Sequence, residues 1–423
     1  MSLTHLPPEL IDQVLSDKDL RTRDLARLAR VNKKTYALVS TRIYRDVTLY
    51  SSGQHGDGEI LDLFHRTLVA TPRLAAITQS LSVSAFLPND AKILQSRQTL
   101  AKLTALRNLS LAFWGSGYLA NLIERVMPTE PDTGATTLAK LQNMTIIDPG
   151  LSFREISKLI CFPSLERLTV KCHRNQETAG CDVLPSTSRH PYSSSLKKLT
   201  LTISTNCNHD LRQVLSACSA LETFICNISP MQNFNDDPVS SADLSRALMS
   251  CQQTLITMEF NSTLGNVDSE RSLELSQFKN VRSLKASSLL LFEEDEQDDP
   301  ALRNGLYTRL PPSLENLEIL FVSDSYAFKS LDEVEGSDDD EAFSTEIKVD
   351  SVIWLSELAH YRQSLSYVRI EEDGGRSPSM RAHKTASLHD APHRVKEAFD
   401  VAHIEIDLYL RPLFYPSLER HSS

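Results

Sequence analysis

The chain has 423 residues, of which 41% are hydrophobic and 23% are charged, proportions that are ordinary for a globular protein. Its formal net charge is −11. Residues 1–50 hold nine Lys or Arg against six Asp or Glu, so the remainder carries −14. An acidic body argues against a nucleic-acid or anionic-membrane surface as the main function. No run of eighteen apolar residues predicts a transmembrane helix, and no secretory signal is recognised, so we expect a cytoplasmic or nuclear protein.

Residues 6–44 predict three short helices. Pro7 and Pro8 stand where a helix can begin, because the first helical amides need no partner. Apolar residues then recur at helical spacing. The three stripes are Leu10, Ile11, Val14 and Leu15; then Leu25, Leu28 and Ala29; then Tyr36, Val39 and Ile43. Three helices of this size bury little surface alone, so they need a neighbour or a partner.

This stretch resembles an F-box, in the form found in fungal F-box proteins. The likeness is carried by the Leu-Pro start at residues 6–7, the block DLARLARV at residues 24–31, and the basic third helix that runs into a strand at residues 44–49. Tyr36 stands where the family usually has tryptophan. The resemblance implies docking, through residues 1–45, on the Skp-family adaptor of a cullin-based ubiquitin ligase. The implied contacts are Leu6, Pro7, Leu10, Ile11, Leu15, Leu25, Leu28, Val31 and Tyr36. The alternative is a plain three-helix cap for the rest of the chain.

Beyond residue 45 one spacing returns: an apolar residue, two others, an apolar residue, one other, an apolar residue. Such triplets arise by chance at about 7% of positions in a chain of this composition, so their regularity matters more than any single match. The accepted triplets follow one another at intervals of 24 to 35 residues through Leu314, with an amphipathic helix in most gaps. They are Leu106-Leu109-Leu111, Leu141-Met144-Ile146, Leu165-Leu168-Val170, Leu196-Leu199-Leu201, Leu221-Phe224-Cys226, Leu255-Met258-Phe260, Val281-Leu284-Ala286, Leu314-Leu317-Ile319 and Leu365-Val368-Ile370, preceded by weaker ones at residues 44–49 and 78–83.

Strand, loop and helix at this period predict a leucine-rich-repeat solenoid over residues 46–423. The fold class is therefore α/β, a curved array with parallel strands on its concave side and helices outside. The sequence resembles the degenerate repeats that follow F-boxes in many family members. No asparagine stands eight positions after the first apolar residue of a triplet, so we expect irregular loops and uneven curvature.

Two acidic tracts, residues 293–299 and 332–346, are read as insertions, the second as a disordered one. A solvated loop is favoured over a docking tail for basic partners. A helix at His393–Val401 and a strand at Ile404–Leu410 predict a C-terminal cap over residues 390–412, because a repeat array must close its open end.

The sequence holds no motif of catalytic chemistry. There is no phosphate loop, no Gly-x-Ser-x-Gly and no His-Glu-x-x-His, so we expect neither an enzyme nor a cofactor. The seven cysteines form no Cys-x-x-Cys pair. Cys172, His173, Cys181 and His190 could be drawn as a zinc set, but their spacing matches no familiar site. Buried reduced thiols are favoured, and no metal is expected.

The residues that flank the apolar pair of each strand point away from the core, by strand alternation. They give a candidate substrate-binding face. The candidates are Arg167, Thr169, Lys171, Lys198, Thr200, Glu259, Lys285, Glu318 and Arg369. Arg167, Lys171 and Lys198 favour an acidic or phosphorylated segment of a partner, and an ordinary solvated face is the alternative.

The F-box resemblance implies a substrate-recognition subunit of a Skp–cullin–F-box type ubiquitin ligase, with the repeats binding a protein substrate. Two alternatives stay open. One is a leucine-rich-repeat interaction scaffold unconnected to ubiquitin. The other is a solenoid GTPase activator, which would need one Arg on a loop edge. Nothing in the sequence identifies the substrate.

Overall fold

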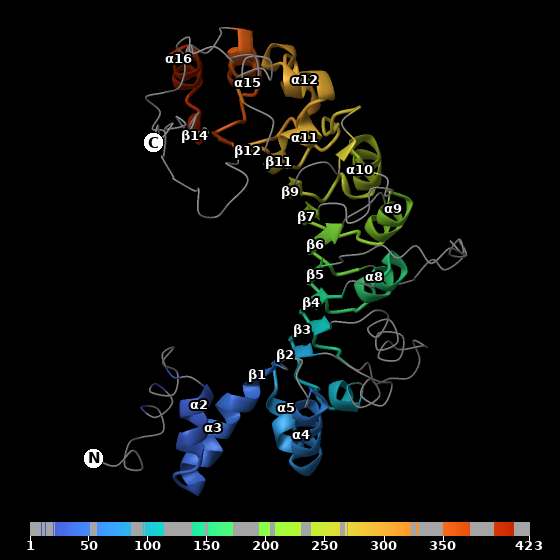
Figure 1. Ribbon diagram of the computed structural model, residues 1–423, viewed down its shortest axis with the longest axis vertical. Coiled ribbons are helices and arrows are strands. Elements are labelled where there is room, and N and C mark those ends of the chain that lie inside the picture. Colours follow the sequence, from blue (N-terminus) through green and yellow to red (C-terminus); the bar gives the residue numbers. More distant parts are fainter. Residues whose placement is uncertain are drawn as a thin grey trace, which may run out of the picture. The chain divides into compact units, whose positions relative to one another are not determined.

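The computed structural model describes residues 10, 13, 20, 22–50, 57–85, 96, 98–113, 138–148, 151–171, 194–203, 208–229, 238–262, 267–268, 270–322, 327–328, 350–372 and 393–409 (Figure 1). The contacts within the chain divide it into two compact units, Met1–Lys197 and Lys198–Ser423. This division lies far from the expected boundary at residue 45, which separates two sequence patterns rather than two contact units. Each unit is described by itself.

The first unit begins with a helical pair, α2 (Thr22–Ala29) and α3 (Lys33–Arg45). Asn32 separates the helices, and its Oδ1 accepts a hydrogen bond from the Thr35 amide at 2.8 Å, which satisfies one free donor at the start of α3. The pair has a small core of its own around Leu25 and Val39. Partly buried residues complete this core: Leu20, Leu28, Ala29, Leu38 and Ile43.

Five parallel strands come next in the first unit, in the order β1-β2-β3-β4-β5. The elements are β1 (Asp46–Tyr50), α4 (Asp57–Ala70), α5 (Pro72–Ile77), β2 (Ser80–Ala85), β3 (Asn108–Phe113), β4 (Asn143–Ile147), α8 (Phe153–Ile160) and β5 (Arg167–Lys171). Helix α8 begins with a capping box, in which the Ser152 Oγ accepts from the Glu155 amide and the Glu155 carboxylate accepts from the Ser152 amide.

The second unit has seven parallel strands in the order β6-β7-β9-β11-β12-β13-β14 and a short parallel pair of β8 with β10. Its strands are β6 (Lys198–Ile203), β7 (Thr223–Ile228), β8 (Val239–Ser240), β9 (Thr257–Ser262), β10 (Val267–Asp268), β11 (Ser283–Ser287), β12 (Asn316–Phe321), β13 (Tyr367–Glu372) and β14 (Glu405–Tyr409). Its helices are α9 (Asn208–Ser216), α10 (Ser241–Leu248), η2 (Met249–Cys251), α11 (Ser288–Leu291), α12 (Glu294–Asp298), η3 (Pro300–Leu302), α13 (Leu306–Arg309), η4 (Asp350–Val352), α15 (Ile353–Tyr361) and α16 (His393–Ala402). None of the helices in the described residues is long and apolar enough to cross a membrane.

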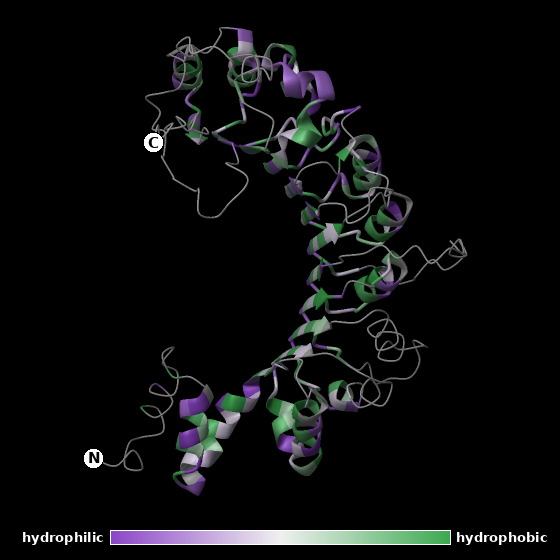
Figure 2. Cartoon of the chain, in the orientation of Figure 1, coloured by the Kyte–Doolittle hydropathy of each residue, from purple (hydrophilic) through white to green (hydrophobic). Residues whose placement is uncertain are grey.

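The apolar triplets predict the strands correctly. In every accepted triplet the first residue is at most 4% exposed, and the other two are buried inside a strand. The register aligns equivalent residues, so that Leu109 lies opposite Met144 and Leu284 lies opposite Leu317. The mixed α/β fold with in-order parallel strands is therefore confirmed. Helices α4, α5 and α8 of the first unit lie on one side of its strands, whereas α2 and α3 lie beyond β1 at the end of the sheet (Figures 1 and 2). In the second unit the helices likewise lie on one side of the strands.

Serine hydroxyls and backbone amides join successive strand segments in place of the missing asparagines. A serine directly precedes the first apolar residue in several segments, and its hydroxyl donates to a carbonyl of the preceding segment. The Ser195 Oγ reaches the Pro163 oxygen at 2.9 Å, and the Ser313 Oγ reaches the Val281 oxygen at 2.9 Å. The serines in this position are Ser164, Ser195, Ser313 and Ser364. These bonds satisfy loop carbonyls that would otherwise lack partners.

The first acidic tract forms helix α12, which is held to the second unit through buried Gln297 and half-buried Glu296, while the rest of the tract is exposed. Arg303 is fully buried, with its guanidinium 4.8 Å from the centre of the Phe292 ring and 4.9 Å from that of Phe321. It donates hydrogen bonds to the carbonyl oxygens of Glu296, Gln297 and Ala327 at 2.6 to 2.9 Å. Burial lowers the pKa of Arg303 to about 9, and the charge of Glu296 opposes that shift. The second tract, residues 332–346, lies outside the described residues.

Helix α16 and strand β14 form where the sequence predicts the last helix and strand. Val395 and Phe399 of α16 are fully buried, and the Ile404 amide donates to the Phe399 oxygen at 2.9 Å. Ile406 of β14 lies opposite Val368 of β13. The last described strand therefore extends the same sheet in the same register.

Candidate protein-interaction surfaces

The helical pair exposes two large apolar side chains at its turn. Val31 is 64% exposed and Tyr36 is 53% exposed. Leu10, which lies nearer the N-terminus, is 46% exposed. In contrast, Leu25 is buried in the core of the pair, and Leu28 is half-buried against it. Four other predicted adaptor contacts lie outside the described residues: Leu6, Pro7, Ile11 and Leu15.

The backbone holds this turn in a defined shape. The Val31 amide donates to the Leu28 oxygen at 3.1 Å, which closes the end of α2. The Tyr36 amide donates to the Asn32 oxygen at 2.9 Å, which opens α3. Val31 and Tyr36 are therefore presented by hydrogen-bonded backbone on both sides of the Asn32 cap. Exposed aromatic and aliphatic side chains on a fixed backbone are typical of protein-binding surfaces.

The open face of the first sheet carries a row of small polar residues. The row is in register across the five strands, and each neighbour is a paired residue. It consists of Thr48, Ser82, Ser110, Thr145 and Thr169. Arg167 and Lys171 lie on either side of Thr169 on β5 and are exposed. Within the described part of the chain, no carboxylate forms an ion pair with either cation.

In the second unit the corresponding row alternates in charge. The Lys285 Nζ lies 3.8 Å from the Glu259 Oε1 and 3.9 Å from the Glu318 Oε2. The Asn261 amide nitrogen donates to the same Glu259 oxygen at 2.9 Å. Lys285 is thus shared by two carboxylates from neighbouring strands. Because these side chains are partly exposed, the pairs add little stability, and the three residues together carry a net charge of −1.

The last two strands, β13 and β14, present an aromatic and charged cluster. The Tyr367 hydroxyl donates to the Asp407 Oδ2 at 2.9 Å. Burial in this cluster and the hydrogen bond to Asp407 raise the pKa of Tyr367 to about 12. The Arg369 guanidinium lies 4.6 Å from the centre of the Tyr409 ring and 2.8 Å from the Glu371 Oε2. The cluster therefore combines two tyrosines with a cation and two carboxylates.

The predicted substrate-binding residues lie at outward strand positions, and these positions are divided between the two units. Arg167, Thr169 and Lys171 lie on β5 of the first unit, and Lys198 and Thr200 lie on β6 of the second. The predicted joint site of Arg167, Lys171 and Lys198 therefore draws on both units. The later residues fall in one row of the second unit: Glu259, Lys285, Glu318 and Arg369.

Sequence reasoning missed Asp407 and Tyr409, because the last strand was read only as a cap. Their signal was present: Ile404-Ile406-Leu408 places Asp407 at the central outward position of its strand, directly opposite Arg369. The same alternation that identified Arg369 would have identified Asp407.

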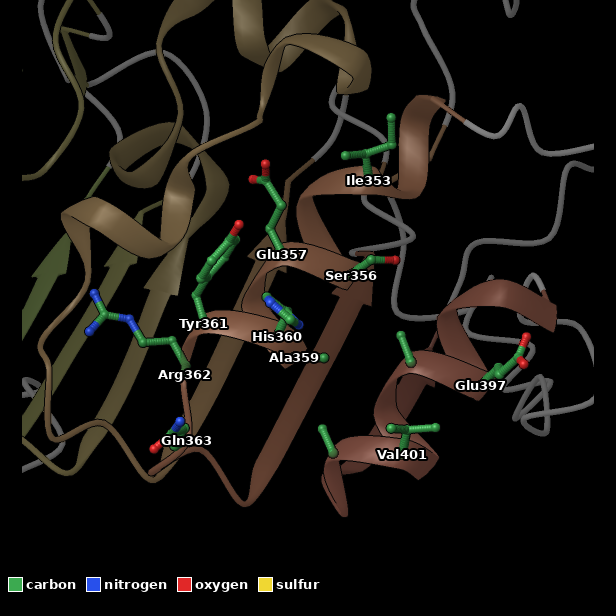
Figure 3. Close-up of a pocket in the computed structure, with 12 residues that line it drawn as sticks. Ile353, Ser356, Glu357, Ala359, His360, Tyr361, Arg362, Gln363, Glu397 and Val401 are labelled. Carbon is green, nitrogen blue, oxygen red and sulfur yellow. The ribbon is translucent and has the colours of Figure 1, made fainter.

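A groove of ≈ 770 Å³ lies between helices α15 and α16 on the helical side of the second unit (Figure 3). Figure 3 shows Glu397 and Val401 of α16 across from Ser356 and His360 of α15. Val401 and Tyr361 give the groove an exposed apolar lining. The described residues contain no group of three His, Cys, Asp or Glu side chains arranged to hold a metal ion.

The described cysteines lie in the packed interior. Cys218, Cys226 and Cys251 are buried and Cys161 is half-buried. Burial raises the pKa of Cys226 to about 12 and also raises those of Cys161 and Cys251. A buried neutral thiol is a poor nucleophile and a poor metal ligand, so these residues act as small apolar side chains. The candidate zinc set, within residues 172–190, lies outside the described residues.

No protein-family model matches this chain, and no curated protein matches it significantly.

Proposed function

We propose that the protein is a substrate-recognition subunit of a Skp–cullin–F-box type ubiquitin ligase. The helical pair docks on the Skp-family adaptor, and through it on a cullin. The open sheet face binds a protein substrate. The ubiquitin chemistry belongs to other subunits, so the protein itself is not an enzyme and needs no cofactor.

The observation that carries this proposal is the helical pair at Thr22–Arg45. The pair has a small core of its own around Leu25 and Val39, yet it leaves Val31 and Tyr36 exposed. Covering either side chain with an adaptor surface would gain up to about 1.5–3 kcal/mol, the value for burying a large apolar side chain. Their exposure favours docking on another protein, as the F-box resemblance of this stretch implies.

The sheet face supports the second half of the proposal. In each unit the in-order parallel strands present outward side chains in register, with Arg167 and Lys171 on β5 of the first unit and the Tyr367 cluster on β13 and β14 of the second. A substrate held on these rows while the helices are docked is kept near the ubiquitin-loaded subunit. Tethering of this kind raises the effective substrate concentration to about the millimolar range without any catalytic group in the tether.

The test compares two exposed valines of the first unit. Val31→Asp places a charge in the proposed adaptor contact, and Val69→Asp makes the same change on α4, where Val69 is 50% exposed. We expect Val31→Asp, alone or with Tyr36→Ala, to weaken binding of purified Skp-family adaptor at least about tenfold. Val69→Asp should bind as the wild type does. Calorimetry with the full chain gives the dissociation constants, and circular dichroism checks the fold.

Equal adaptor affinity for Val31→Asp and Val69→Asp would contradict the proposal, as would a wild-type chain that does not bind the adaptor. Either result would favour the alternative function, an interaction scaffold unconnected to ubiquitin.

A further inference from the structure

The helical pair is strongly basic in an otherwise acidic chain. Residues 22–45 contain seven Lys or Arg and a single Asp, a net charge of +6. Because the whole chain carries −11, all other residues together carry −17. The only carboxylate of this segment, Asp24, is paired with Arg27 over 3.7 Å. The positive charge of the helical pair is thus almost uncompensated within its own elements.

Three cations lie on α2 or directly after it, ahead of the exposed apolar turn. Arg23 and Arg27 are four residues apart on α2, so they share one helix face, and Arg30 follows the last residue of the helix; all three are exposed. Lys33, also exposed, stands three residues before Tyr36 on α3 and shares its face. We call Arg23, Arg27, Arg30 and Lys33 the basic rim, with Val31 and Tyr36 as its centre.

This arrangement costs the free protein stability. Like charges four residues apart on a helix destabilise it by about 0.2–0.5 kcal/mol. Lys33 also stands in the first turn of α3, which holds no acidic residue, where the helix dipole disfavours a cation by about 0.3–1 kcal/mol. Helix stability explains only Arg27, which lies in the last turn of α2, where the helix dipole favours a cation, and is paired with Asp24. Negative charge supplied by a partner would offset the costs at Arg23 and Lys33.

We infer that the surface which receives the helical pair is an acidic protein surface with an apolar recess at its centre. This inference rests on the proposed function and specifies its partner chemistry. The exposed Val31 and Tyr36 require the recess, and the rim requires carboxylates around it. A nucleic acid or an anionic membrane fits less well, because the −17 carried by the rest of the chain would be repelled by a long or extended anion.

A charged rim around an apolar centre divides the kinetics of binding between two sets of residues. Long-range attraction by the rim speeds association and is weakened by salt, whereas short-range packing of the centre slows dissociation. The rim should therefore control the association rate, and Val31 with Tyr36 should control the dissociation rate.

The test measures association and dissociation of purified Skp-family adaptor with the full chain at low and high salt. Arg23→Glu/Arg30→Glu reverses two rim charges, and Arg66→Glu/Arg73→Glu makes the same change at two exposed arginines of α4 and α5. We expect the rim variant to associate at least about tenfold more slowly than the control variant at low salt, with the difference largely lost at high salt. Its dissociation rate should change less than about threefold.

The outcomes separate the inference from the proposed function. Equal association rates for the two double variants would overturn the inference, and loss of adaptor binding by Val31→Asp in the same experiment would leave the proposed function standing. Adaptor binding that resists Val31→Asp as well would remove both. Duplex DNA and phosphatidylserine vesicles serve as competing probes, and wild-type binding to either as tightly as to the adaptor would also overturn the inference.

Discussion

Arg303 holds the acidic helix α12 to the core of the second unit. Its guanidinium lies against the rings of Phe292 and Phe321 and donates to three carbonyl oxygens, one of which belongs to Ala327. A buried cation is costly to desolvate, but this cost is offset here by three short hydrogen bonds and by two aromatic faces. The chain thus uses an arginine where apolar residues alone would leave loop carbonyls without donors.

Replacing Arg303 should therefore strongly destabilise the second unit. Arg303→Met keeps much of the apolar volume but leaves three carbonyls unsatisfied, and we expect a loss of about 3 kcal/mol in the free energy of unfolding of the second unit. Urea denaturation followed by tryptophan fluorescence measures it, since Trp354 is buried against Phe292. The matched control is Arg282→Met, an exposed arginine in a loose pair with Glu315 at 3.5 Å, which should cost below about 0.5 kcal/mol. Similar losses for both variants would contradict the buried role of Arg303.

The raised pKa of Tyr367 predicts how the stability of the protein depends on pH. Its pKa in the folded protein, about 12, lies above the value near 10 of an unfolded tyrosine. The folded state therefore binds the phenolic proton more tightly, so this contribution to stability is complete below pH 10 and is lost as pH rises through 12. Tyr367→Phe should lose less stability between these two pH values than the wild type.

A direct titration of the phenol checks the cause. Asp407→Asn removes the charge that faces the Tyr367 hydroxyl, so it should lower the pKa of Tyr367 toward 10 while leaving the part that is due to burial. Ultraviolet difference absorbance, with Tyr367→Phe as the reference for this one phenol, gives the value. If the pKa of Tyr367 were unchanged in Asp407→Asn, the hydrogen bond to Asp407 would not be a cause of the raised pKa.

At the scale of elements, helix α8 depends on its capping box. Ser152 and Glu155 satisfy each other's backbone amides, and the Glu155 carboxylate lies in the favourable first turn of the helix. Because α8 buries Ile156, Leu159 and Ile160 behind the strands, fraying its start would also loosen the core of the first unit.

Ser152→Ala should reduce the stability of the first unit by about 1 kcal/mol, the usual cost of losing an N-cap side chain. Thermal unfolding of the full chain measures the change. Ser152→Thr retains a hydroxyl in the capping position and serves as the control, with an expected loss of less than half as much. A Ser152→Ala variant as stable as the wild type would show that the cap contributes nothing.

Some elements were predictable because their signal is local. The triplet spacing specifies which side of each strand is buried, so it gave both the strands and the register of the outward rows. The caps at Asn32 and Ser152 are local features too, because each cap is defined by residues three apart. The serines that bind the preceding segment were not predicted, since a hydroxyl next to leucine has many possible partners in a sequence.

At the scale of the whole molecule, sequence reasoning missed features that depend on side-chain contacts rather than on periodic spacing. The acidic tract at residues 293–299 is mostly exposed, but a Glu296 carbonyl and carboxylate bind Arg303 and Arg309, and arginines usually lie at the surface. The division at Lys197 also has no local sign, because it reflects how contacts are distributed over the whole fold.

The candidate docking site on the helical pair was predictable only in part. Helical spacing identified Leu25 and Tyr36, and the F-box resemblance added Val31. Neither could separate Leu25, which forms the core, from Val31 and Tyr36, which remain exposed. That distinction depends on how the two helices pack together. It matters for function, because only the exposed residues are available to a partner.

The central claim is that the helical pair is the docking element and that the sheet is left free for a substrate. Hydrogen–deuterium exchange of the full chain, with and without purified Skp-family adaptor, tests it most directly. We predict slower amide exchange on adaptor binding within residues 22–45 and no change in strands β6 to β14. No protection in residues 22–45, or protection that instead appears across the strands of the second unit, would contradict the claim.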